Sequence, residues 1–188
     1  MKQIFALIMM MACCYACSSS TTEVTEDTAQ QVYNDFKGTY QGAVMVDNIP
    51  QAVIITIGND FQVSRLPVKP ILKRIFTDEA QLTQALATTS VVNFTAKTET
   101  ISFATTEAYL YMEPTDLQFS VTVDGTERHI DALMDALVYK SSSYNYITAY
   151  LLVKDLICDG TPYDSSKESI TYYIDSAQKQ TEEKQNNY

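Results

Sequence analysis

The stretch that decides the fold is residues 117–125, with the sequence LQFSVTVDG. Every second residue from Leu117 to Val123 is apolar, and Gln, Ser and Thr lie between them, which is typical of a strand with one buried face. Asp124-Gly125 is the two-residue turn signal of a hairpin. The sequence therefore predicts an antiparallel hairpin that returns from Thr126 to Ile130.

More strands are expected on both sides of this hairpin. Residues 39–46 and 52–57 are rich in Thr, Tyr, Val and Ile, and the turn residues of Asp47-Asn48-Ile49-Pro50 separate them. They predict a second hairpin. Further short strands are expected within residues 61–63, 92–94, 101–103, 109–111, 144–153, 156–158 and 169–174.

Helical spacing of apolar residues interrupts the strands. Residues 71–76 and 82–86 follow it, with Asp78 as a cap between them. Residues 130–138 also fit a short helix, because adjacent apolar pairs break strict alternation there. The sum predicts an α+β fold, an antiparallel β-sheet or β-sandwich with two or three short helices.

Composition limits the classes of protein to which this chain can belong. Its 188 residues, 46% hydrophobic and with five glycines and five prolines, suit one ordinary folded domain. The formal net charge of −10 would repel a phosphate backbone, so we expect no nucleic-acid partner. The glycines never cluster as a nucleotide-binding loop requires.

The first residues have the features of a signal peptide. Lys2 is positive, and residues 4–12 are uninterruptedly apolar but too few to span a bilayer as a helix. The next stretch, MMACCYACSSS, resembles the lipobox of bacterial lipoproteins, in which a small residue precedes the lipidated cysteine. The resemblance implies several acyl chains on that cysteine, which anchor a protein stably in a bilayer.

Two cysteines follow a small residue, Cys13 after Ala12 and Cys17 after Ala16. We favour Cys17, because a polar linker begins directly after it. Cys13 is the alternative, since the residues before it are closer to the apolar lipobox pattern. Ser18 after Cys17 implies sorting to the outer membrane, and we expect the periplasmic side rather than the cell surface.

These signals divide the chain into four parts. The expected parts are a signal peptide (1–16), a flexible tether (17–35), a single β-rich domain (36–175) and a polar tail (176–188). The whole mature chain resembles the small lipoproteins of anaerobic Gram-negative bacteria that are described only as a domain of unknown function. This resemblance rests on the lipobox-like cysteines, on GTYQG at residues 38–42, and on FQVSRLP at residues 61–67 leading into Ile71-Leu72.

Few residues of the sequence are candidates for catalysis or metal binding. His129 is the single histidine, which is too few for a metal cluster or an obvious nucleophile–base pair. Asp155, Asp159 and Asp164 lack the spacing of a calcium-binding loop. We therefore expect no catalytic residue, no metal and no cofactor.

Tyrosines are the most suggestive side chains. The chain has 13, and Tyr144, Tyr146 and Tyr150 share one face of a strand if the alternation holds. Such a face can bind a peptide, a glycan or an apolar ligand. We expect a non-catalytic, membrane-anchored envelope lipoprotein that binds or scaffolds another envelope component, protein or glycan. The alternative is a hydrolase or inhibitor that acts on cell-wall or dietary polymers.

Overall fold

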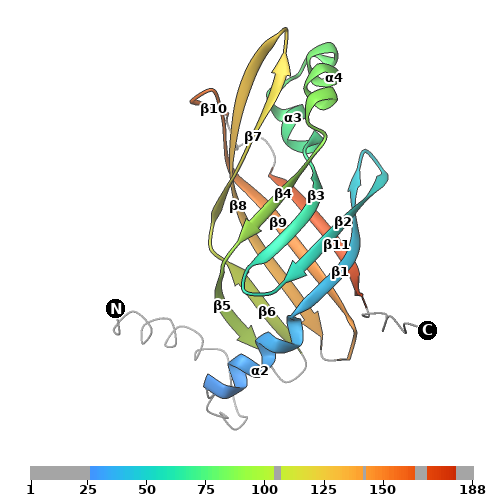
Figure 1. Ribbon diagram of the computed structural model, residues 1–188, viewed down its shortest axis with the longest axis vertical. Helices are drawn as coiled ribbons and strands as arrows, with labels where there is room; N and C mark the ends of the chain where they lie inside the picture. Colours follow the sequence, from blue (N-terminus) through green and yellow to red (C-terminus); the bar gives the residue numbers. More distant parts are fainter. Residues whose placement is uncertain (1–25, 104–106, 142, 164–168, 181–188) are drawn as a thin grey trace, which may run out of the picture.

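The computed structural model describes residues 26–103, 107–141, 143–163 and 169–180. Most of them lie in one antiparallel 11-stranded sheet that curls into a nearly closed, barrel-like shape (Figure 1). The strands are β1 (Gly38–Val46), β2 (Ile49–Ile57), β3 (Phe61–Pro67), β4 (Val91–Ala96), β5 (Thr98–Phe103), β6 (Glu107–Met112), β7 (Thr115–Val123), β8 (Thr126–Ser141), β9 (Tyr146–Cys158), β10 (Thr161–Tyr163) and β11 (Ile170–Lys179). The helices are α2 (Glu26–Phe36), α3 (Lys69–Ile75) and α4 (Glu79–Thr88).

Closure of the sheet depends on two consecutive strands, β4 and β5. The strand order is β4-β3-β2-β1-β11-β9-β8-β6-β5, so these two strands stand at opposite ends of the sheet. Yet only Lys97 separates them in the chain. The main-chain oxygen of Lys97 accepts a hydrogen bond from the N–H of Glu113 (2.8 Å). The chain therefore joins the two ends of the sheet, which forces the sheet to curl.

The long strands β8 and β9 extend beyond the barrel as an arm. The first part of β8 pairs with β7 and its last part with β6, while β9 pairs first with β11 and then with β10. Helix α4 lies against β7 (Figure 1), where Gln84 Oε1 accepts from the N–H of Asp124 (2.7 Å) and Thr89 donates to the main-chain oxygen of Ser120 (2.9 Å). Side chains of α4 and of the residue that follows it thereby satisfy backbone groups of β7 and of the turn after it.

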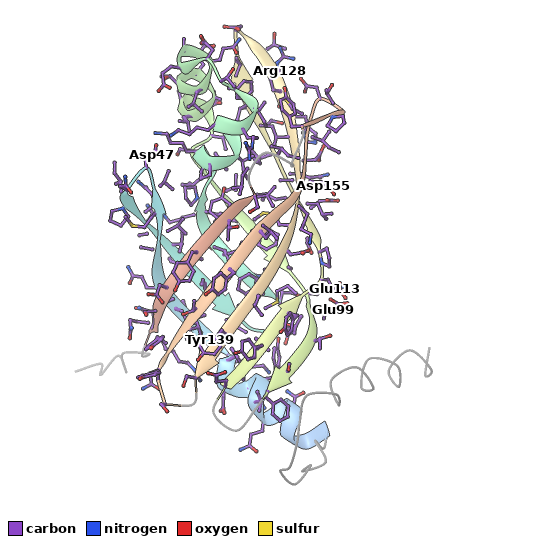
Figure 2. The ribbon with its side chains drawn as sticks, turned by 180° about the vertical axis from the view of Figure 1, so that it is seen from behind. Asp47, Glu99, Glu113, Arg128, Tyr139 and Asp155 are labelled. Atoms are coloured by element: carbon purple, nitrogen blue, oxygen red, sulfur yellow. The ribbon has the colours of Figure 1, made fainter. Side chains whose placement is uncertain are left out.

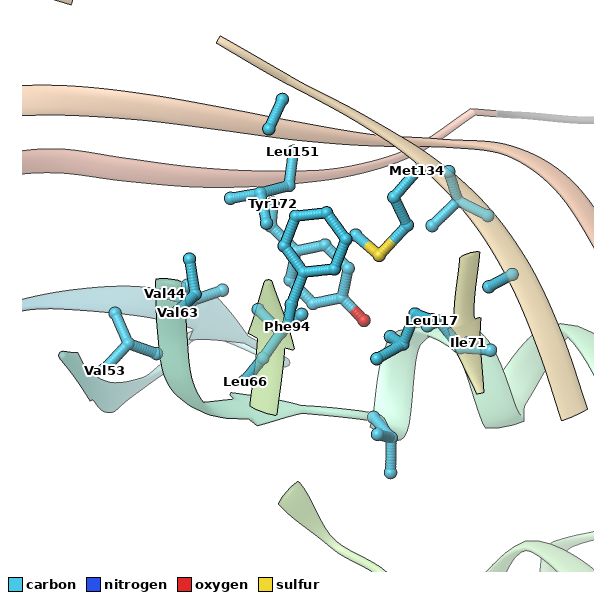
Figure 3. Packing of buried hydrophobic residues seen from close by; sticks show 14 of the residues in the cluster. Val44, Val53, Val63, Leu66, Ile71, Phe94, Leu117, Met134, Leu151 and Tyr172 are labelled. Carbon is cyan, nitrogen blue, oxygen red and sulfur yellow. The ribbon is translucent and has the colours of Figure 1, made fainter. Parts of the chain in front are cut away.

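The core fills the inside of the barrel with apolar and aromatic side chains (Figure 3). Phe94 and Tyr172 are buried side by side with aliphatic residues such as Leu151 and Met134. The buried hydroxyl of Tyr172 donates to the main-chain oxygen of Pro67 (3.0 Å). Its polar atom is therefore satisfied although the ring lies in an apolar interior.

The expectation of an α+β fold is wrong. The described part of the chain is predominantly antiparallel strand, in a nearly closed sheet with three short helices. Residues 130–138, expected as a helix, belong to β8. Their inward residues alternate in a strict period of two, but Leu133 and Leu137 on the outer side are also half-buried. Because this strand bears apolar residues on both faces, its sequence pattern also fits the spacing of a helix.

The two hairpins predicted from the sequence are confirmed, as β1–β2 and β7–β8. Residues 71–76 and 82–86 coincide with α3 and α4. The stretch expected as a flexible tether to residue 35 contains α2 from Glu26 onward, while residues 17–25, with the lipidation cysteines, lie outside the described residues. At the other end, β11 continues to Lys179, past the expected domain end at residue 175.

Candidate functional site

The most distinctive surface of the barrel is a row of large side chains across four neighbouring strands. Tyr111 of β6 pairs with Leu137 of β8, Leu137 with Tyr150 of β9, and Tyr150 with Tyr173 of β11. Residues directly opposite one another in antiparallel strands project from the same face of the sheet. We call these four residues the tyrosine flank.

The tyrosine flank lies on the outside of the barrel. The residues next to its members in sequence, such as Leu110, Val138, Leu151 and Tyr172, are almost fully buried in the core. Tyr111, Tyr150 and Tyr173 in contrast are 41%, 41% and 47% exposed. Because successive side chains of a strand point to opposite faces, burial of one set places the other in solvent. The rings of Tyr150 and Tyr173 lie 5.0 Å apart.

A groove of about 370 Å³ is lined by three of the four flank residues, Tyr111, Leu137 and Tyr150. Its lining residues come from strands β5, β6, β8 and β9 and from the link before β7: Glu99, Tyr111, Met112, Pro114, Asp135, Ala136, Leu137, Tyr150 and Leu152. Figure 2 shows these strands from outside, with Glu99 labelled on β5. The groove thus combines aromatic and aliphatic surface with carboxylates, in the manner of a binding surface with a few polar groups.

Hydrogen bonds between tyrosines and carboxylates order the surface beside the groove. Glu107 accepts from the hydroxyls of Tyr109 (2.9 Å) and Tyr139 (3.2 Å), whose rings lie 5.2 Å apart. The bond to Glu107 raises the pKa of Tyr109, because the neutral phenol is the form that donates. Asp135 forms an ion pair with Lys154 (2.9 Å). The hydroxyls of Tyr109 and Tyr139 thus hold the carboxylate of Glu107 between them.

The three tyrosines proposed from the sequence lie in two places. Tyr144 precedes β9 and stacks on Tyr146, with ring centroids 4.9 Å apart. Tyr150 lies four residues, or two periods of the strand alternation, after Tyr146 and belongs to the tyrosine flank. Tyr173 and Tyr111 were not among the proposed residues, because only the pairing of β9 with β11 and of β8 with β6 brings them beside it. In the sequence, Tyr111 and Tyr173 are marked only by their positions in alternating strands, which does not show that they lie near Tyr150.

His129 lies on the arm, opposite Ser120 of β7. Its Nδ1 is 3.4 Å from Ser120 Oγ, and its Nε2 is 3.4 Å from Asp131 Oδ1. Both distances are longer than ordinary hydrogen bonds, and the imidazole is exposed. A hydrolytic triad needs tight contacts in a site that excludes water. This arrangement provides neither.

Of the three aspartates considered for calcium, Asp159 has a structural role. Asp159 accepts from the N–H of His129 and from Arg128, both at 2.9 Å, which lowers the pKa of its carboxyl. Asp164 lies outside the described residues. Within the described ranges, no group of three or more His, Cys, Asp or Glu could hold a metal ion.

The described helices are also too short or too polar for a membrane: none of them could cross a bilayer.

Residues 35–155 match a family of proteins described as a domain of unknown function, DUF4840. The chain belongs to this family. The DUF4840 region includes Tyr111, Leu137 and Tyr150 of the tyrosine flank, whereas Tyr173 lies beyond it. The expectation of an uncharacterised family is thereby confirmed, and lipoprotein character stays a prediction. No curated protein and no solved structure matches the chain.

Proposed function

We propose that this DUF4840 protein is a lipid-anchored, non-catalytic binding module of the cell envelope. Its N-terminal cysteine attaches it to the membrane, and the tyrosine flank holds another envelope component. The observation that supports binding best is the half-exposed tyrosine flank, three of whose residues, Tyr111, Leu137 and Tyr150, line a groove. Tyrosine provides a large contact area at a low cost in conformational entropy, and it is enriched at binding surfaces.

The anchor is supported by the sequence before the folded domain. If Cys17 is acylated, residues 18–25 separate it from the start of α2, a distance of at most about 28 Å in extended chain. The barrel would then stay close to the bilayer surface. Its acidic net charge of −10 disfavours adsorption to anionic lipid, so attachment would depend on the acyl chains.

Substitution of the cysteines tests the anchor. Cys17→Ser should abolish fatty-acid labelling and release the protein from membranes, whereas Cys13→Ser should leave both unchanged. Metabolic labelling with palmitate and membrane fractionation measure the two effects. Labelling that persists in Cys17→Ser and disappears in Cys13→Ser would move the anchor to Cys13, and labelling unchanged in both would contradict the lipoprotein proposal.

The size of the native complex tests the binding surface. Envelope extracts that contain the wild-type protein should show it in a species larger than the monomer on a native gel, and Tyr150→Ser/Tyr173→Ser should shift it to the monomer. Met45→Ser/Ile49→Ser is the matched control, because these residues are exposed and apolar but lie at the β1–β2 turn. Equal migration of all three proteins would argue against the flank as the binding surface.

The hydrolase alternative gains no support from the described residues. Glu99 and Asp135 both line the groove, but the groove is an open outer surface and Asp135 is bound to Lys154. Polymer hydrolysis by two carboxylates depends on a site that shields the reacting groups from bulk water. We therefore propose binding alone.

A further inference from the structure

The chemistry of the groove indicates which kind of ligand the tyrosine flank accepts. Phenol rings present a negative face to an approaching group, and that face attracts ammonium and guanidinium ions. Tyr150 and Tyr173 expose such rings side by side. Glu99 at the groove and Asp175 near Tyr173 add full negative charges. The surface therefore favours cations through two independent interactions.

Lys154 shows how an amine fits this surface. Its ammonium group lies 2.9 Å from the carboxylate of Asp135, which lines the same groove. Both side chains are partly exposed, so the pair is open to exchange with an amine from another molecule. An incoming lysine could replace Lys154 at Asp135 or bind beside it at Glu99.

The dimensions of the flank suit a polypeptide. Its four residues lie on four neighbouring strands, and three spacings of about 4.8 Å give a row about 14 Å long. An extended peptide covers that length with about four residues, with alternate side chains directed to the surface. The aliphatic side chains of Leu137 and Leu152 provide contacts for the methylene stems of the basic side chains that face the groove.

We propose that the ligand of the tyrosine flank is an extended segment of a partner protein in which every second residue is lysine or arginine. This proposal rests on the proposed binding function and specifies its ligand. The net charge of −10 complements such a partner at long range and accelerates its encounter with the flank. The rings and carboxylates of the groove then provide the local fit.

Fluorescence anisotropy with a defined probe tests the proposal. The probe is a short labelled peptide that alternates lysine and serine, and its partner probe has glutamate in place of lysine. The full-length protein should bind the lysine peptide and not the glutamate peptide. Tyr150→Ser/Tyr173→Ser and Glu99→Gln should each weaken binding about three- to tenfold. Lys154→Gln should strengthen it, because a competing cation is removed.

Glu127→Gln and Met45→Ser are the controls, since they remove an exposed acid and an exposed apolar residue elsewhere on the surface. Both should leave the affinity unchanged. An equal loss in Glu127→Gln would overturn the proposal, because it would reveal general attraction to the acidic protein. Binding of the glutamate peptide, or of neither peptide, would also overturn it. The native-gel test of Tyr150→Ser/Tyr173→Ser does not depend on the probe peptides. If that shift is seen although the lysine peptide does not bind, the flank is still the binding surface, but its ligand is a different one.

Discussion

Two consecutive residues, Tyr172 and Tyr173, show how one residue type can have opposite roles in this fold. Tyr172 points into the barrel, where it is 1% exposed and its hydroxyl is bound to Pro67. Tyr173 points outward and contacts the ring of Tyr150. The alternation of the strand separates them. One tyrosine therefore supports the core, and the other is available to a ligand.

Tyr172→Phe should destabilise the protein, because it removes the donor to a buried main-chain oxygen. The expected loss in the free energy of unfolding is about 1 to 3 kcal/mol. Tyr173→Phe is the control on the same strand and should stay within about 0.5 kcal/mol, as exposed substitutions usually do. Denaturant unfolding measures both. Equal losses in the two variants would show that the two tyrosines are not on opposite faces.

Burial also makes the inner tyrosines sensitive to alkali. It raises the pKa of Tyr40 from 10.0 to about 12, and it raises the pKa of Tyr172 further. The unfolded chain loses these protons near pH 10 while the folded chain retains them, so stability is complete below pH 10 and falls as the pH rises above it. Unfolding measured against pH should show this loss, and Tyr172→Phe should reduce its slope.

At the scale of the elements, the contact between β1 and β11 depends on a residue without a side chain. A Cβ at Gly42 would lie 2.7 Å from Ile174 Cγ2 and 3.0 Å from the Cβ of Ala177. The pairing of the two strands also shifts register between Gln41 and Val44. Glycine therefore permits β11 to approach β1, and this contact holds the last strand between β1 and β9.

Gly42→Ala should weaken that contact. The methyl group would push β1 and β11 apart, at an expected cost of about 1 to 3 kcal/mol, as for overpacking in a well-packed interior. Gly58→Ala is the matched control, because a Cβ there meets no atom within 4 Å. Thermal and denaturant unfolding compare the two variants. A stable Gly42→Ala protein would contradict the close approach of these strands.

The sequence predicts individual elements better than their assembly. The hairpin at residues 117–125 and the cap at Asp78 depend on neighbouring residues, and both are present: Asp78 Oδ1 accepts from the N–H groups of Ala80 and Gln81. Residues 130–138 of β8 were predicted as a helix because the outer face of the strand also bears apolar residues there. Tyr150 could be proposed from its own strand, but the flank required the pairing of strands far apart in the chain.

At the scale of the whole molecule, closure of the sheet separates the aromatic side chains of the core from the exposed tyrosines of the flank. The connection of β4 to β5 through Lys97 joins the sheet's ends, so most barrel strands have a buried inner face and an exposed or half-buried outer face. The enclosed face forms the core of Figure 3. The exposed face presents the tyrosine flank, opposite in the barrel wall to Tyr172 and Leu151. On our proposal, this exposed row is the surface that binds a partner.

Site-specific photo-crosslinking in living cells tests the binding role of the flank most directly. A benzophenone side chain replaces Tyr150, Tyr173 or Tyr111 in the full-length protein, and Met45 or Val91, exposed residues elsewhere, in the controls. After irradiation, our account predicts one crosslinked product shared by the flank positions and missing from both controls. Absence of a product at the flank, or the same product from Met45 and Val91, would contradict it.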